Sequence, residues 1–91
     1  MTKEEAIRRT NEVFEKDFEI APEKLKPEAH IFKDLGLDSL DIVDLVVALQ
    51  KKFGVTIRDD ERVRNIRTLG DVHSFIFLLG QEGLAQGDKE A

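Results

Sequence analysis

Residues 34–41 have the sequence DLGLDSLD, and they mark the point where a loop becomes a long apolar helix. Asp38 is a strong N-cap residue, so Ser39 takes the first helical position and should lie exposed at the helix N-terminus. We expect this helix to run to about Phe53, with Gly54 as its C-terminal stop. Apolar residues recur along it at a spacing of three and four, which predicts a buried face made of Leu40, Val43, Val46, Val47, Ala48 and Leu49. Because charged residues are rare in this segment, the helix should be the central one of a bundle.

A hydroxyl at a helix N-terminus is well placed to carry a phosphodiester. The free N–H groups and the dipole of the first turn favour a phosphate there. The stretch DLGLDSLD also resembles the prosthetic-group attachment motif of acyl carrier proteins, in which the Ser after Asp carries 4′-phosphopantetheine. In size, helix order and motif position, the resemblance covers residues 2–80. It implies that Ser39 is the attachment residue, with Asp38 and Leu40 as its neighbours in the cofactor-binding motif.

The resemblance also implies a carrier that is not itself an enzyme. A phosphopantetheinyl transferase would move the arm from coenzyme A, with magnesium, onto Ser39, and the terminal thiol of the arm would hold acyl groups as thioesters. The expected partners are this transferase and the acyl-transfer or chain-elongation enzymes of fatty acid biosynthesis or of a specialised lipid pathway, such as that of lipid A.

Two other interpretations remain open at this point. The chain also fits a peptidyl, aminoacyl or polyketide carrier, or a small helical interaction protein in which the motif is coincidental. Direct catalysis by Ser39 is disfavoured, because a nucleophilic serine needs a base that a third group orients. The only histidines, His30 and His73, have no local motif around them, and we interpret them as ordinary loop and helix-surface residues.

The composition fits one small soluble domain of 91 residues with 41% hydrophobic residues, no Cys and a formal net charge of -5. Without Cys, the chain has no disulfide framework, no thiolate zinc site and no cysteine nucleophile. No apolar run approaches the ~20 residues of a membrane span, and the N-terminus is acidic where a secretory signal would be basic. We therefore expect a cytoplasmic monomer without stable membrane insertion. Residues 1–80 should form the domain, and residues 81–91 a flexible tail.

The remaining segments predict an all-α, right-handed bundle of three main helices with a short helix in third position. Thr2 and Glu5 form a capping-box pattern that opens the first helix. The predicted apolar side of this helix consists of Ala6, Ile7, Thr10, Val13, Phe14 and Phe18. A long loop follows from about residue 19 to residue 37 and contains Pro22 and Pro27. The apolar residues available to pin this loop are Leu25, Ile31, Phe32 and Leu35.

The second half of the chain should end in another long helix. Residues 55–57 form an extended stretch that is too short to demand a sheet, and residues 58–67 predict a short helix or an irregular turn. Thr68 offers a cap for the last helix. The predicted core face of that helix consists of Leu69, Val72, Phe75, Ile76 and Leu79. Phe77 or Leu78 cannot reach this face and should be exposed.

Charged residues near Ser39 predict contacts with partners. In the resembling family, acidic side chains at the places of Asp41 and Asp44 meet Lys and Arg of the transferase and of the acyl-chain enzymes, so the resemblance implies the same role here. The acids of this region do not follow the register of a calcium-binding EF-hand loop, and we expect no metal site. The basic cluster consists of Arg58, Arg62, Arg64 and Arg67. Arg62 and Arg64 are candidates for partner contacts, whereas the interleaved acids and the net negative charge argue against nucleic-acid binding.

Apolar residues of the second helix and of the region after it are core residues in the first place. The resemblance implies that this interior also opens to shelter an acyl chain, with each buried methylene contributing about 0.8 kcal/mol. The predicted pocket residues are Val43, Val46, Leu49, Ile57 and Ile66. The chain departs from the family at Gln50, Lys51, Lys52 and Arg58, where further acids and a proline are usual. These departures indicate a specialised carrier with a dedicated partner.

Overall fold

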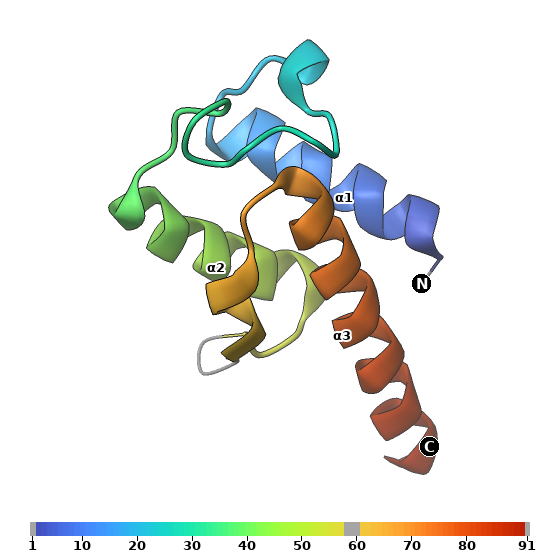
Figure 1. Ribbon diagram of the computed structural model, residues 1–91. Helices are drawn as coiled ribbons and strands as arrows, with labels where there is room; N and C mark the ends of the chain where they lie inside the picture. The colour runs from blue at the N-terminus through green and yellow to red at the C-terminus, as the bar shows by residue number, and fades with distance from the viewer. Residues whose placement is uncertain (1, 58–60, 91) are drawn as a thin grey trace.

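A computed structural model describes residues 2–57 and 61–90, with side chains through residue 82. Within these ranges the elements are α1 (Lys3–Asp17), η1 (Pro22–Lys24), α2 (Ser39–Phe53), η2 (Glu61–Asn65) and α3 (Leu69–Glu90), where η denotes a 3-10 helix. The described ranges contain no β-strand, so the prediction of an all-α bundle is confirmed (Figure 1). The predicted bounds of α2 are confirmed as well. None of the helices, over the residues described, has the combined length and apolar character of a membrane span.

α1 is the helix that packs against both of the others. Its start follows from local capping, because the Thr2 hydroxyl accepts a hydrogen bond from the Glu5 amide at 3.1 Å. Its buried side chains are Ala6, Thr10, Val13 and Phe14. Contacts between α2 and α3 are fewer than those that either helix makes with α1. The expectation that α2 is the central helix is therefore wrong, and α1 takes that place (Figure 1).

The long loop between α1 and α2 is anchored to the start of α3. The Leu69 amide donates a hydrogen bond to Ala29 O at 2.9 Å, and the Gly70 amide donates to Pro27 O at 2.8 Å. A Cβ atom at Gly70 would come to 3.0 Å from the same carbonyl oxygen, so the close approach favours glycine. The buried side chains of the loop include Ile31, Leu35 and Leu37. Phe32 is 42% exposed, and the expectation that it pins the loop is wrong.

α2 is apolar around most of its circumference, but only part of that circumference is covered. Its buried residues are Leu45 and Leu49. Leu40, Val43 and Val47 are 76%, 60% and 43% exposed, so the prediction that they belong to the buried face is wrong. These three residues recur at i, i+3 and i+7 and form a stripe that faces away from the core. Several apolar stripes were available in this sequence, and packing selected the one that contains Leu45 and Leu49.

The segment between α2 and α3 begins with an extended stretch that is tied to α2. The Ile57 amide donates to Oε1 of Gln50 at 2.8 Å, and the Ile57 side chain is buried. The predicted short helix occurs as η2, and the partly buried Val63 and Ile66 pack this segment against the core. Residues 58–60, which include the predicted basic-cluster member Arg58, lie outside the described residues.

α3 begins with a reciprocal cap and continues beyond its predicted end. The Thr68 hydroxyl accepts from the Asp71 amide at 3.2 Å, and the Asp71 carboxylate accepts from the Thr68 amide at 3.0 Å. The amides of Arg67 and Thr68 hold the pKa of Asp71 below its ordinary value, because both donate to the charged carboxylate. The helix runs to Glu90, and its C-terminal part projects from the bundle in Figure 1. The flexibility of residues 81–91 stays a prediction.

The faces of α3 differ in their surroundings. His73 is buried, and its Nε2 lies 2.7 Å from Oδ1 of Asn11 on α1. The interpretation of His73 as a helix-surface residue is therefore wrong, because α1 covers this face. Burial, followed by the nearby charge of Lys3, lowers the pKa of His73. On another face Leu78 is 48% exposed, as expected for one member of the pair with Phe77.

Candidate functional site

Ser39 occupies the first position of α2, where a reciprocal cap orders the backbone. Asp38 has an extended backbone, and its Oδ1 accepts a hydrogen bond from the Asp41 amide at 2.9 Å. In return, Oδ2 of Asp41 accepts from the Asp38 amide at 3.0 Å. The two carboxylates thereby satisfy two donors at the helix start. The turn that carries Ser39 is held by its own sequence neighbours.

The Ser39 side chain is exposed, as predicted, at a helix end that suits an anion. The amides of Ser39 and Leu40 belong to the first turn of a 15-residue helix, and N–H groups of a first turn have no acceptor inside their helix. These donors and the helix dipole favour a negatively charged group beside the hydroxyl. A phosphodiester at Oγ of Ser39 meets both conditions, so the residues of this site fit a 4′-phosphopantetheine group.

In the described part of the chain, no contact activates Ser39 as a nucleophile. Nε2 of His73 is engaged with Asn11 between α1 and α3. Nδ1 of His30 accepts from the amides of Phe32 and Lys33, both at 3.2 Å, so His30 organises its own loop. The described side chains also contain no group of three or more potential ligands that could hold a metal ion. The arrangement presents a hydroxyl without the oriented base of a catalytic serine.

The acids expected to meet partner enzymes differ in their availability. Asp44 is exposed on α2, and Asp38 is exposed at its start. The Asp41 side chain is half-buried, because its carboxylate is hydrogen-bonded to the Asp38 amide. Asp41 is therefore less open to a partner than Asp44, and its partner contact stays a prediction. Asp38 and Asp44 are the acids that this end of α2 leaves open to a partner.

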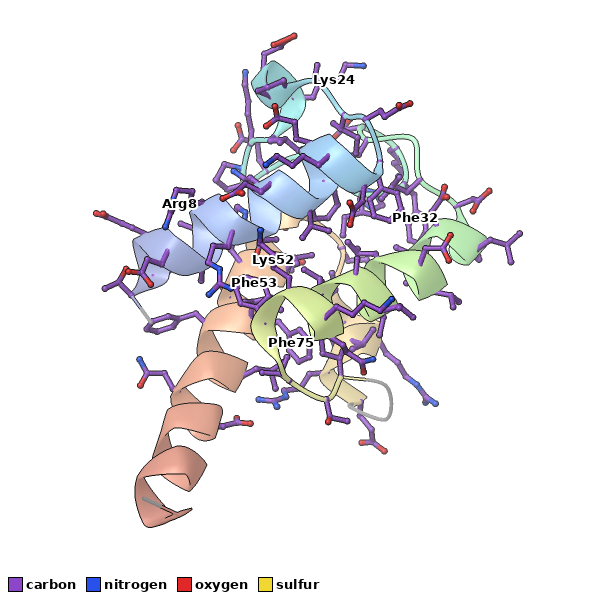
Figure 2. The ribbon with its side chains drawn as sticks, turned by 180° about the vertical axis from the view of Figure 1, so that it is seen from behind. Arg8, Lys24, Phe32, Lys52, Phe53 and Phe75 are labelled. Atoms are coloured by element: carbon purple, nitrogen blue, oxygen red, sulfur yellow. The ribbon has the colours of Figure 1, made fainter. Side chains whose placement is uncertain are left out.

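An apolar cavity of about 270 Å³ lies beside α2, between the loop, the η2 segment and the start of α3. Four of the predicted pocket residues line it: Val46, Leu49, Ile57 and Ile66. Ile42 and Leu45 of α2, Phe32 of the loop and Phe75 of α3 also contribute to its wall. Figure 2 shows Phe32 near the N-terminal half of α2, which places this wall close to the helix end that carries Ser39.

Val43, the fifth predicted pocket residue, does not line this cavity. It borders a separate surface hollow together with Val47, so the prediction of Val43 as a pocket residue is wrong. The face toward the cavity is made by Ile42, Leu45, Val46 and Leu49, which recur at i, i+3, i+4 and i+7. This spacing was present in the sequence and is the signal that could have identified Ile42 and Leu45.

Arginines of the predicted basic cluster fall into two groups. The Arg62 guanidinium donates to both carboxylate oxygens of Glu82, at 2.9 and 3.1 Å, and lies over the Phe75 ring. Arg62 therefore ties η2 to α3, and its contact with a partner stays a prediction. Arg64 and Arg67 are exposed and line the cavity. The sequence placed Arg67 in the basic cluster but did not place it at the cavity, because that position depends on how this segment packs.

The C-terminal end of α2 is bound to α1 through charged groups. Nη2 of Arg9 donates to Lys52 O at 2.8 Å, and the guanidinium lies 4.8 Å from the centroid of the Phe53 ring. Nζ of Lys52 lies 3.5 Å from Oε2 of Glu12, and the charge of Lys52 is the main cause that lowers the pKa of Glu12. Figure 2 shows Lys52 and Phe53 at this end of α2, beside α1. Lys51 is exposed.

Comparisons with known proteins converge on one family. Residues 10–76 match the family model described as "Phosphopantetheine attachment site". The chain is 43% identical over 72 residues to the acyl carrier protein 2 of Ralstonia nicotianae, which covers 79% of this chain and 88% of the relative. It is 45% identical over 65 residues to the acyl carrier protein of Wolinella succinogenes, with coverage of 71% and 84%.

Proposed function

This chain belongs to the acyl carrier protein family, and we propose that Ser39 is the residue to which its 4′-phosphopantetheine is attached. The protein is an acyl carrier and not a catalyst. The observation that carries the assignment to Ser39 is an exposed hydroxyl directly after the N-cap of α2. When bound, the group supplies the thiol that a chain without Cys lacks.

The residues around Ser39 support its modification by an external transferase. Oγ of Ser39 forms the new phosphodiester bond, the nucleotide part of coenzyme A leaves, and the hydroxyl proton passes to a base of the transferase. The carrier itself only presents the hydroxyl, because the cap between Asp38 and Asp41 holds the turn in place. The amides of the first turn stabilise the resulting negative charge by about 0.3–1 kcal/mol at an exposed site.

The surface next to Ser39 supports docking of the transferase and of acyl-transfer or chain-elongation enzymes. Leu40, Val43 and Val47 form the exposed apolar stripe of α2. Asp38 and Asp44 add negative charge beside this stripe. A partner that fits this surface combines apolar side chains with Lys or Arg, because apolar contacts supply affinity and complementary charges guide the encounter.

The cavity beside α2 supports storage of the acyl chain. Val46, Leu49, Ile57 and Ile66 line it, and each methylene that enters it contributes about 0.8 kcal/mol relative to water. We propose fatty acid or specialised lipid biosynthesis as the pathway, with the protein acting as a cytoplasmic monomer. Exposed Lys51 favours a specialised pathway, because it places positive charge in the last turn of α2, at the end of the helix away from Asp38.

Intact mass tests the attachment directly. After incubation with coenzyme A and a promiscuous phosphopantetheinyl transferase, the protein should gain the mass of one phosphopantetheinyl group. Ser39→Ala should abolish the gain, whereas Ser74→Ala should retain it. Ser74 is the matched control, because it is exposed on α3 and is the second of the two serines in the chain. No gain in the unaltered protein, or a gain that survives Ser39→Ala, would reject the proposal.

A further inference from the structure

Arg64 and Arg67 lie together at the rim of the cavity. Both line it and both are exposed, whereas the other lining residues are apolar. Those that are buried form its interior: Ile31, Leu45, Leu49, Ile57, Val72 and Phe75. The cavity therefore has an apolar interior and two exposed arginines in its lining.

The Arg67 guanidinium is held in place and keeps donors to spare. Nη1 donates to Arg64 O at 2.7 Å and to Ile66 O at 3.1 Å. A guanidinium has five N–H groups, so those of Nη2 and Nε remain. Asp71 contributes a nearby negative charge, but its carboxylate accepts from the amides of Arg67 and Thr68.

The three described arginines of this segment differ in how they are used. Arg62 is engaged by Glu82 in a bidentate pair. Within the described ranges, neither Arg64 nor Arg67 has a carboxylate oxygen within 4.0 Å. Packing against α3 therefore accounts for Arg62. Arg67 is tied only to carbonyls of its own segment, and Arg64 makes no side-chain hydrogen bond in this part of the chain.

One wall of the cavity lies close to the start of the arm. Ile42 and Val46 line the cavity from the same helix that carries Ser39. Ile42 lies three residues after Ser39, about 4.5 Å along the helix axis. An acyl chain that enters across the rim places its far end in the apolar interior and the carbons next to the thioester beside the arginines.

We propose that Arg64 and Arg67 bind an oxygen substituent next to the thioester, so that this carrier holds β-hydroxyacyl chains in the cavity more tightly than unsubstituted chains. The proposal rests on the proposed carrier function and names its preferred cargo. A hydroxyl at the β-carbon can accept from a guanidinium at the rim while the rest of the chain stays in apolar surroundings. An oxygen at the far end of the chain is disfavoured, because the interior offers no polar side chain to satisfy it.

The test loads the carrier from coenzyme A thioesters with three chains of equal length: octanoyl, 3-hydroxyoctanoyl and 8-hydroxyoctanoyl. Hydroxylamine cleaves thioesters that are open to solvent, and each rate is divided by the rate for the same thioester on free coenzyme A. The 3-hydroxyoctanoyl form should be protected about fivefold better than the octanoyl form, which corresponds to one ordinary net hydrogen bond. Equal protection of the two forms, or equal or better protection of the 8-hydroxyoctanoyl form, would overturn the proposal.

Variants assign the effect to the rim. The double variant R64Q/R67Q should lose the fivefold difference and keep the protection of the octanoyl chain, which shows that the cavity is intact. The single variant R64Q should give an intermediate difference, and it serves as the second test if the double variant fails to fold. Arg8→Gln is the control, because Arg8 is exposed on α1 and does not line the cavity. A full difference in R64Q/R67Q contradicts the proposal, while failure of loading at Ser39 would instead contradict the proposed function.

Discussion

Two sides of the molecule differ in how far their apolar side chains are buried. One is the side where α1 meets α3, and the other is the side formed by α2 and η2. Between α1 and α3, apolar side chains such as Phe14 and Ile76 are fully buried, and His73 is hydrogen-bonded to Asn11. On the other side, α2 leaves Val43 and Val47 exposed and encloses an apolar cavity with η2. The first side is a fully packed core, whereas the second leaves apolar surface available to a partner or an acyl chain.

This difference separates stability from binding within one small domain. Buried apolar side chains stabilise the fold, and truncating them leaves cavities that the structure cannot close. A contiguous apolar stripe on the surface contributes little to stability and is typical of an interaction site. Substitutions on the first side should therefore act on unfolding, and substitutions on the second should act on partners and cargo.

The largest change in the free energy of unfolding is expected on the side where α1 meets α3. Phe14→Ala should lower the free energy of unfolding by about 3–5 kcal/mol, because the ring is fully buried. Phe32→Ala is the matched truncation on the cavity side, and it should cost well under half as much because Phe32 is partly exposed. Urea unfolding followed by circular dichroism measures both. Similar losses of unfolding free energy in the two variants would show that both sides contribute equally to stability, which contradicts the comparison.

The next effect is a pH dependence that originates between α1 and α3. The pKa of His73 is lowered in the folded protein, and the ordinary value is 6.5. As the pH falls below about 6.5, the unfolded chain binds a proton that the folded chain does not bind. Stability is therefore fully present above this pH and is lost below it, by at most about 1.4 kcal/mol per pH unit.

His73→Gln isolates this contribution. Glutamine keeps a donor for Asn11 but does not titrate. The unfolding free energy is measured with urea at several pH values between about pH 5 and pH 7.5. It should rise less steeply with pH in the variant than in the unaltered protein. An unchanged pH dependence of the unfolding free energy would mean that His73 is not the residue that titrates.

A smaller effect concerns the helix start that presents Ser39. Asp38→Ala removes the N-cap acceptor of the Asp41 amide and should cost about 1 kcal/mol of unfolding free energy. Asp44→Ala should change stability by less than about 0.5 kcal/mol, because Asp44 is exposed and makes no hydrogen bond or ion pair in the described structure. Thermal and urea unfolding measure the stability of both variants. Equal losses of unfolding free energy would argue against a stabilising N-cap at Asp38.

The smallest effect on stability is expected in the exposed stripe. Val43→Ala should change the unfolding free energy by less than about 0.5 kcal/mol. The same change should raise the KM of the phosphopantetheinyl transferase about two- to fivefold, because an apolar contact with the enzyme is lost. Leu78→Ala is the control, since Leu78 is also exposed but lies on α3. An equal rise in KM for both variants would show that docking does not depend on α2.

The sequence was most informative where structure depends on neighbours along the chain. Thr2, Asp38 and Thr68 were expected to cap helices, and each accepts the amide three residues later. The exposure of Ser39 follows from the same local chemistry, because a first helical position after a cap faces solvent. Fold class and the bounds of α2 could therefore be predicted.

The sequence was least informative where structure depends on which faces meet. α2 offers apolar residues in nearly every direction, so spacing alone did not decide between the stripe of Leu45 and Leu49 and that of Leu40 and Val43. The burial of His73 depends on α1, which is distant in sequence. The place of Arg67 at the cavity depends on the packing of the η2 segment. The positions of His73 and Arg67 are tertiary facts that leave no pattern within one segment, whereas the cavity face of α2 was one of several apolar stripes that its spacing allowed.

The most direct test of the central claim locates the modification on the chain. Cleavage by trypsin after Lys33 and Lys51 releases residues 34–51, a peptide in which Ser39 is the only residue with a hydroxyl side chain. After treatment with coenzyme A and a phosphopantetheinyl transferase, tandem mass spectrometry should find the added mass on this peptide and on Ser39 within it. An unmodified 34–51 peptide from a protein whose intact mass has increased would contradict the account.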